Sequence, residues 1–392
     1  MRDGSLKTVL IASTLMAGAA LSSAASAQTA APAAAALPAS NPLATPSPLP
    51  FAAPVFDRLR ETDLKPAIEA GMAQDQIESD AIANNPAPPT FENTIVAQEK
   101  EGALLNRANQ LLSHLVGANT SDLLDQVNQD EAPRLQAHSD AIMLNPKLFA
   151  RVKALYDQRE TLGLSASDRF LLELYYRRFV HAGALLSDAD KAKLSALNGQ
   201  IASLQAQYQD RLKAAADANA VVVKDRAELD GLSDAEIAVT EAAAKARKLD
   251  GQYVIVLRNT TQQPILASLT NRALRARILA ASESRGDGPG PTDLRDLIAS
   301  LAQLRAQKAQ LLGFANYSAY VLSMQMAQTP ENARKLLDSL APAAAAKARA
   351  EAAETQALID QQKGGFTLTA SDWEFYADQV RKAKYSLDDQ QF

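Results

Sequence analysis

The chain has 392 residues, with 40 lysine and arginine residues against 45 aspartate and glutamate residues and a formal net charge of −5. A mild negative charge without a long basic stripe argues against a nucleic-acid partner. The length suffices for one large domain or two ordinary ones, since domains usually span about 100 to 200 residues. No cysteine is present, so an exported form would have to be stable without disulfides.

Residues 1–27 have the features of a secretory signal peptide. Arg2 and Lys7 supply positive charge, residues 8–20 form an apolar stretch, and the small residues Ala25, Ser26 and Ala27 offer a cleavage site. The apolar stretch is shorter than the roughly 20 residues that cross a bilayer, although a membrane anchor is the alternative interpretation. We therefore predict cleavage near Ala27 and a periplasmic or secreted protein without a membrane anchor.

Residues 28–50 are rich in alanine, proline and serine. Such a segment buries little apolar surface, and its prolines lack amide donors, so we predict an extended, disordered tether. Order is expected to begin near Phe51, and the helical body is expected to span residues 51–392.

The dominant period from residue 51 onward is helical. A long helix is predicted from Ser187, because apolar residues from Leu194 to Leu212 recur at steps of three and four residues and form one stripe. Three pairs of a serine and an acidic residue, spaced as in a capping box, predict helix starts: Ser165 with Asp168, Ser187 with Asp190, and Ser233 with Glu236.

Two short runs break the helical pattern. Residues 221–223 and 253–257 are β-branched or aromatic and adjoin turn-forming polar residues, as strands do. They predict one small ribbon on an otherwise helical body. The expected fold class is therefore mainly α with a minor β ribbon.

The last third of the chain returns to helical signals. Gly313 is a plausible helix stop, and Thr329 before Pro330 predicts a cap and a first-turn proline. The alanine-rich stretch 341–357 could be a helix or a tether. Its interspersed lysine, arginine and glutamate residues favour a solvated helix.

Histidines are the first candidates for metal chemistry, and the chain has three: His114, His138 and His181. None begins a His-Glu-x-x-His motif, and none has a second histidine four residues away, the spacing typical of helical zinc sites. Ordinary surface or core positions are the favoured interpretation for all three. With no cysteine and no Gly-x-Ser-x-Gly motif for a nucleophile, we predict no catalytic, cofactor-binding or metal-binding residue in this chain.

The segment Asp372–Tyr376 combines two carboxylates with three aromatic residues. General acid and base catalysis would need the two carboxylates in different environments across a cleft, whereas residues two apart on a helix point in different directions. An aromatic anchor that packs a helix is therefore favoured over a catalytic pair.

An ordered series of short motifs runs through nearly all of the predicted mature chain. It comprises Asn41–Leu43, Ser47–Pro50, Pro66-Ala67 with Gly71-Met72, Pro89–Ile95, Asn145–Val152, Leu171–Glu173 with Tyr175-Tyr176, Gly183–Ser187, Asn271–Arg275, Leu311–Gly313, Met326-Ala327 with Thr329–Glu331, Asp372-Trp373 and Lys384–Asp388. This series resembles the N-terminal part of peptidyl-dipeptidases, which belong with oligopeptidase A and thimet oligopeptidase among the zinc metallopeptidases. The order and number of the matches carry the resemblance.

The resemblance implies a helical lobe of a two-lobed, channel-containing metallopeptidase. Members of this family cleave short unstructured peptides, and the peptidyl-dipeptidases release dipeptides from a free C-terminus. The family holds its zinc with the two histidines of His-Glu-x-x-His and a later glutamate, while the motif glutamate activates water. In the family these residues lie downstream of the position that matches Phe392.

We therefore expect an exported peptidase portion, truncated before the zinc motif and inactive alone. Its expected partners are short peptide substrates, in the complete enzyme, and the missing C-terminal catalytic half. We also expect the isolated chain to self-associate. Helices such as Leu194–Leu212 would expose apolar faces that the missing half normally covers, and the strand 253–257 would present an unpaired edge. A helical peptide-binding or interaction module without catalysis is the alternative function.

Overall fold

The computed structural model describes residues 37–386, and the side chains of residues 259–263 lie outside that description. The predicted signal peptide, the first part of the predicted tether and the end of the Lys384–Asp388 motif also lie outside the described residues. None of the helices between residues 37 and 386 is long and apolar enough to cross a membrane.

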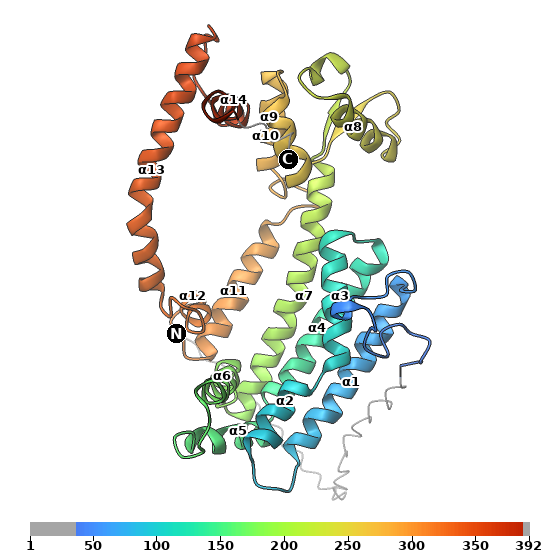
Figure 1. Ribbon diagram of the computed structural model, residues 1–392, viewed down its shortest axis with the longest axis vertical. Coiled ribbons are helices and arrows are strands. Elements are labelled where there is room, and N and C mark those ends of the chain that lie inside the picture. Colours follow the sequence, from blue (N-terminus) through green and yellow to red (C-terminus); the bar gives the residue numbers. More distant parts are fainter. Residues whose placement is uncertain (1–36, 387–392) are drawn as a thin grey trace, which may run out of the picture. The chain divides into compact units, whose positions relative to one another are not determined.

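The described chain is mainly helical, as predicted (Figure 1). Its α-helices are α1 (Leu64–Ala83), α2 (Ala97–Lys100), α3 (Ala103–Ala118), α4 (Asp122–Met143), α5 (Pro146–Asp157), α6 (Ala166–Ala182), α7 (Asp188–Ala218), α8 (Asp234–Ala246), α9 (Asn259–Ser268), α10 (Arg272–Glu283), α11 (Arg295–Leu311), α12 (Tyr317–Leu322), α13 (Pro330–Gln361) and α14 (Trp373–Tyr385). A π-helical turn spans Phe91–Val96, and short 3-10 turns span Pro50–Ala52, Glu61–Asp63, Arg226–Leu229 and Ala370–Asp372. The strands are β1 (Val221–Val223) and β2 (Tyr253–Ile255).

The predicted helix starts are confirmed by their caps. The side chains of Ser165, Ser187 and Ser233 each accept a hydrogen bond from the backbone N–H three residues later. Thr329 does the same before α13, where Pro330 is the first helical residue. These bonds satisfy amide donors that have no partner within the first turn of a helix.

The predicted ribbon is also confirmed. Strands β1 and β2 pair antiparallel, with Val221 opposite Ile255 and Val223 opposite Tyr253. Because Ile255 and Leu257 are buried in a cluster with residues of α8, α9 and α10, the apolar side chains of this segment are covered. The sheet described has two strands, so β2 keeps one unpaired edge, and self-association through that edge stays a prediction.

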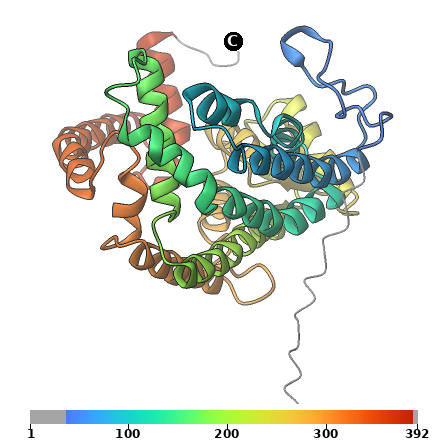
Figure 2. The ribbon, with the colours of Figure 1, turned by 90° about the horizontal axis from the view of Figure 1, so that it is seen from below.

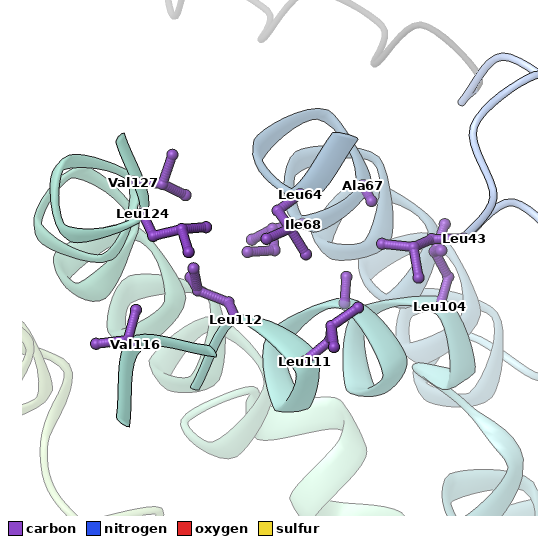
Figure 3. Close-up of a cluster of buried hydrophobic side chains, with 11 residues drawn as sticks. Leu43, Leu64, Ala67, Ile68, Leu104, Leu111, Leu112, Val116, Leu124 and Val127 are labelled. Carbon is purple, nitrogen blue, oxygen red and sulfur yellow. The ribbon is translucent and has the colours of Figure 1, made fainter. Parts of the chain in front are cut away.

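A first core cluster lies between α1, α3 and α4 (Figure 3). Leu64 and Ile68 of α1 are fully buried against Leu112 of α3 and Leu124 of α4. Leu43, which lies within the predicted tether, belongs to the same cluster and is only 7% exposed.

The start of the ordered body is therefore corrected to a position before Phe51. Asn41 fixes the segment, because its side-chain amide donates to the carbonyl of Asp63 at 2.9 Å and its side-chain oxygen accepts from the N–H of Leu43 at 2.9 Å. Composition predicted a tether here, but Leu43 and Asn41 anchor it, together with Arg107 of α3, whose Nη2 donates to the carbonyl of Leu43 at 3.2 Å.

Helix α7 lies beside α4 and α11 (Figure 1 and Figure 2). Its apolar stripe is covered by these neighbours, and Leu194 and Ile201 are buried. The expectation that this stripe is exposed is therefore wrong. A further cluster joins α5 and α6 to the turn Phe91–Val96, and Phe179 of α6 is a fully buried member of it.

Candidate functional site

The three histidines lie on three different helices. His114 is exposed on α3. His138 of α4 lies with its Nε2 2.7 Å from Asp75 Oδ2 of α1. Within residues 37–386 we find no group of three or more histidine, aspartate or glutamate side chains that could hold a metal ion. The expectation that the family's zinc ligands lie beyond this chain stays a prediction.

His181 joins α6 to α12. Its Nε2 lies 2.9 Å from the carbonyl oxygen of Tyr320, and the two rings stack with centroids 4.0 Å apart. A carbonyl can only accept, so Nε2 carries the proton. Burial lowers the pKa of His181 and outweighs the opposing bond to Tyr320. The stacked ring and its bond to Tyr320 therefore hold α6 against α12.

A cluster of one carboxylate and two guanidinium groups lies where α10 meets the start of α14, and the side chain of one of the two arginines, Arg272, is 42% exposed. Asp372 is fully buried, and Arg275 is only 1% exposed. Arg275 Nη2 donates to Asp372 Oδ1 at 2.9 Å, while Arg272 donates to Oδ1 from Nε at 2.9 Å and to Oδ2 from Nη2 at 2.9 Å. Bidentate pairing of this kind is among the strongest ionic contacts in proteins.

Aromatic rings cover this ion cluster. The guanidinium carbon of Arg272 lies 4.0 Å from the centroid of Phe366, and that of Arg275 lies 4.4 Å from the centroid of Phe375. Cations over ring faces gain further electrostatic stabilisation when they are removed from water. The segment Asp372–Tyr376 thus fastens α14 to α10, in agreement with the favoured interpretation as an anchor.

Asp372 is unsuited to acid–base chemistry. Burial raises the pKa of its carboxyl, but the hydrogen bonds from Arg272, Thr369 and Arg275 lower it more, so the pKa lies well below its ordinary range. A carboxylate that stays ionised and has its oxygens bonded neither donates nor accepts a proton near neutral pH. Its function is therefore positional.

Beside this cluster, a cavity of about 300 Å³ lies between α9, α13 and α14. Trp373 forms part of its wall, and the charged side chains around it have both signs, with Lys347 Nζ 3.4 Å from Glu351 Oε1. An aromatic wall with mixed charges can accept a polypeptide segment. No local pattern in the sequence predicted this cavity, because its residues come from three segments of the chain.

A second unpredicted feature is a group of carboxylates between α1 and α3. Glu101 follows α2, and Gly102, in the left-handed region with φ 69°, donates its N–H to Glu78 Oε2 at 2.8 Å. Among the described residues, Glu101 Oε2 is a buried oxygen without a hydrogen-bond partner. Burial and the negative charges of Asp75 and Glu78 raise the pKa of Glu101 to about 8.

We expect Glu101→Gln to stabilise the protein at pH 8 by on the order of 1–3 kcal/mol. The raised pKa means that folded Glu101 keeps a proton that the unfolded chain releases above its ordinary pKa of 4.5. The free energy of unfolding therefore falls as pH rises from about 4.5 to 8, and the glutamine variant should lose this dependence. Urea denaturation at a series of pH values measures both effects. The exposed Glu241→Gln on α8 is the matched control, and equal pH profiles for the two variants would contradict the assignment.

The comparisons with known proteins point to one family. Residues 265–392 match the model of peptidase family M3. The chain is 43% identical over 342 residues to the dipeptidyl carboxypeptidase of Escherichia coli K12. The aligned region covers 87% of this chain and 50% of that protein. The chain is related to peptidase family M3. The dipeptidyl carboxypeptidase of Salmonella typhimurium is 41% identical over the same share of each chain, and the Escherichia coli oligopeptidase A is 25% identical over 87% of this chain and 51% of its own.

The ion cluster lies in the part of the chain that matches the M3 model. The chain spans about half the length of the curated relatives it matches. Arg272, Arg275 and Asp372 all lie within the residues that match the family model. The ion cluster and the neighbouring cavity therefore belong to the part of the chain that the M3 model describes, whereas helices α1 to α8 lie before it.

Proposed function

We propose that this chain is the N-terminal portion of an exported zinc metallopeptidase that releases dipeptides from the free C-terminus of short peptides. The observation that carries the proposal is the 43% identity to a dipeptidyl carboxypeptidase over 342 residues. Identity to oligopeptidase A is 25%, which favours the dipeptide-releasing branch. Export is proposed from the signal-peptide features of residues 1–27.

In this proposal the chain supplies a helical framework. Arg272, Arg275 and Asp372 set the position of α14 relative to α10. The described residues offer no ligand group for zinc, so we assign the metal and the water-activating glutamate to the half that the relatives have and this chain does not span. The chain alone is then inactive.

The first test is the coding sequence after residue 392, where we expect an open frame that encodes His-Glu-x-x-His. The chain should be produced with its native N-terminus, so that its intact mass reports cleavage after Ala27. We expect the purified chain to bind no stoichiometric zinc and to hydrolyse no peptide. Co-expression with the following half should yield one zinc per pair and release of dipeptides from peptides with a free C-terminus, but not from amidated ones.

A single tightly held zinc in the isolated chain, lost when His114, His138 or His181 is replaced, would overturn the assignment of the metal. The alternative, a peptide-binding module without catalysis, is favoured by the cavity beside Trp373. It predicts that the isolated chain binds short peptides and quenches Trp373 fluorescence, with no gain of hydrolysis when the second half is added.

A further inference from the structure

Helix α13 has no cover along half of its length. Every residue from Arg334 to Ala350 is exposed. The main neighbours of α13 are α12 and α14 (Figure 1). Its buried residues, Thr355 and Ile359, lie in its C-terminal half. Long helices in proteins owe most of their stability to packing, and no residue of this segment is buried within the described structure.

The uncovered segment carries an apolar stripe. Leu336, Leu337 and Leu340 are 62%, 65% and 58% exposed. Ala344 and Ala348 continue the row from Leu340 at steps of four residues, which places them on the same helix face. These five residues are the α13 stripe. Its alanines would let a second helix approach closely, at axis distances of roughly 8–10 Å.

Pro342 makes the lack of cover more costly. It lies inside the helix, where proline removes the hydrogen bond to the carbonyl four residues earlier and costs about 3 kcal/mol relative to alanine. The alanine-rich sequence favours a helix. The three exposed leucines, however, leave apolar surface in contact with water, which is unfavourable. Contacts with another polypeptide would offset both costs.

We propose that the α13 stripe is the docking face for the half of the peptidase that follows residue 392. This inference rests on the proposed function, because it takes the following half to be part of the same protein. Two observations support this occupant: α13 lies within residues 265–392, which match the M3 model, and the chain spans about half the length of its relatives.

A second copy of this chain fits the stripe less well. A fully exposed leucine side chain offers roughly 60–120 Å² of apolar surface, so these three partly exposed leucines offer roughly 100–220 Å² per copy. Stable complexes bury about 800 Å² per partner. A half joined in the same chain avoids most of the entropic cost of association, so a small apolar stripe can contribute to its docking.

The test compares two triple variants of the complete protein, each cleaved after folding at a protease site inserted behind Phe392, so that docking is measured as retention of the following half by this chain. The first is Leu336→Gln, Leu337→Gln and Leu340→Gln, and glutamine preserves helix propensity. The matched control replaces exposed apolar residues elsewhere: Leu123→Gln, Leu185→Gln and Ile298→Gln. We expect the tagged wild-type and control chains to recover equal amounts of the following half. The α13 variant should recover at most roughly one tenth of that amount. Circular dichroism of each isolated chain checks that the variants fold.

Hydrogen exchange on the complete protein gives an independent measurement. The amides of residues 334–350 should exchange on the order of 100-fold more slowly in the complete protein than in the isolated chain, because a covered helix opens less often. Equal exchange, or full recovery by the α13 variant, would overturn the docking face. A stop codon directly after Phe392 would also overturn it. A dimer of this chain that persists in the presence of the following half, and that the α13 substitutions dissociate, would show that the stripe binds a second copy instead. A pair that assembles through the stripe but hydrolyses no peptide would refute the proposed function alone.

Discussion

Replacing Asp372 by asparagine should lower the free energy of unfolding by roughly 3–5 kcal/mol. The substitution keeps the shape of the side chain and removes the charge that compensates Arg275, which is 1% exposed. Breaking a buried ion pair by neutralising one partner leaves the other charge without water and without a counter-charge. Urea denaturation followed by the fluorescence of Trp373, the single tryptophan of the chain and the neighbour of Asp372, measures the effect at the site itself.

The pH dependence of this loss distinguishes a charge effect from a packing effect. The pKa of Asp372 is depressed in the folded protein, so its stabilisation is complete above the ordinary aspartate pKa of about 3.9 and is lost as pH falls below it. The difference between wild type and Asp372→Asn should therefore be constant above about pH 5 and shrink in more acidic solution. Asp338→Asn, exposed on α13, should change stability by less than about 0.5 kcal/mol. A similar loss in both variants would show that the ion cluster is not the cause.

Phe179→Ala should cost about 3–5 kcal/mol. Phe179 is fully buried, and its ring centroid lies 5.9 Å from that of Phe149 across the contact between α5 and α6. Removing the ring leaves a cavity that well-packed neighbours fill only in part. The midpoint and slope of a urea titration give the change in the free energy of unfolding.

Phe170→Ala is a matched control on the same helix. Phe170 is 61% exposed, so truncation should change stability by less than about 1 kcal/mol. Because both substitutions change the same residue type in α6, the difference between them isolates burial from helix propensity. Equal losses would mean that α6 does not pack against α5 as described.

The sequence alone determined the local elements of this protein. The starts of α6, α7, α8 and α13 were predicted because a cap is a bond between residues three apart, so the signal lies within one turn of the chain. The β1–β2 ribbon was predicted from β-branched runs for a similar reason. The resemblance to the family of peptidyl-dipeptidases and oligopeptidase A followed from the order of many short motifs, and the similarity to these peptidases and to the M3 model confirmed it.

Only the tertiary structure decided which faces are covered and which charges meet. A periodic apolar stripe shows that one side of a helix avoids water, but the stripe of α7 is covered by α4 and α11 while that of α13 is exposed. Asp372 pairs with Arg272 and Arg275, which lie 100 and 97 residues earlier in the sequence. Leu43 belongs to the first core cluster, although the composition of its segment predicted a disordered tether. The physical reason is the same in each case. Burial and ion pairing depend on segments brought together by packing, and no local spacing in the sequence records which segments these are.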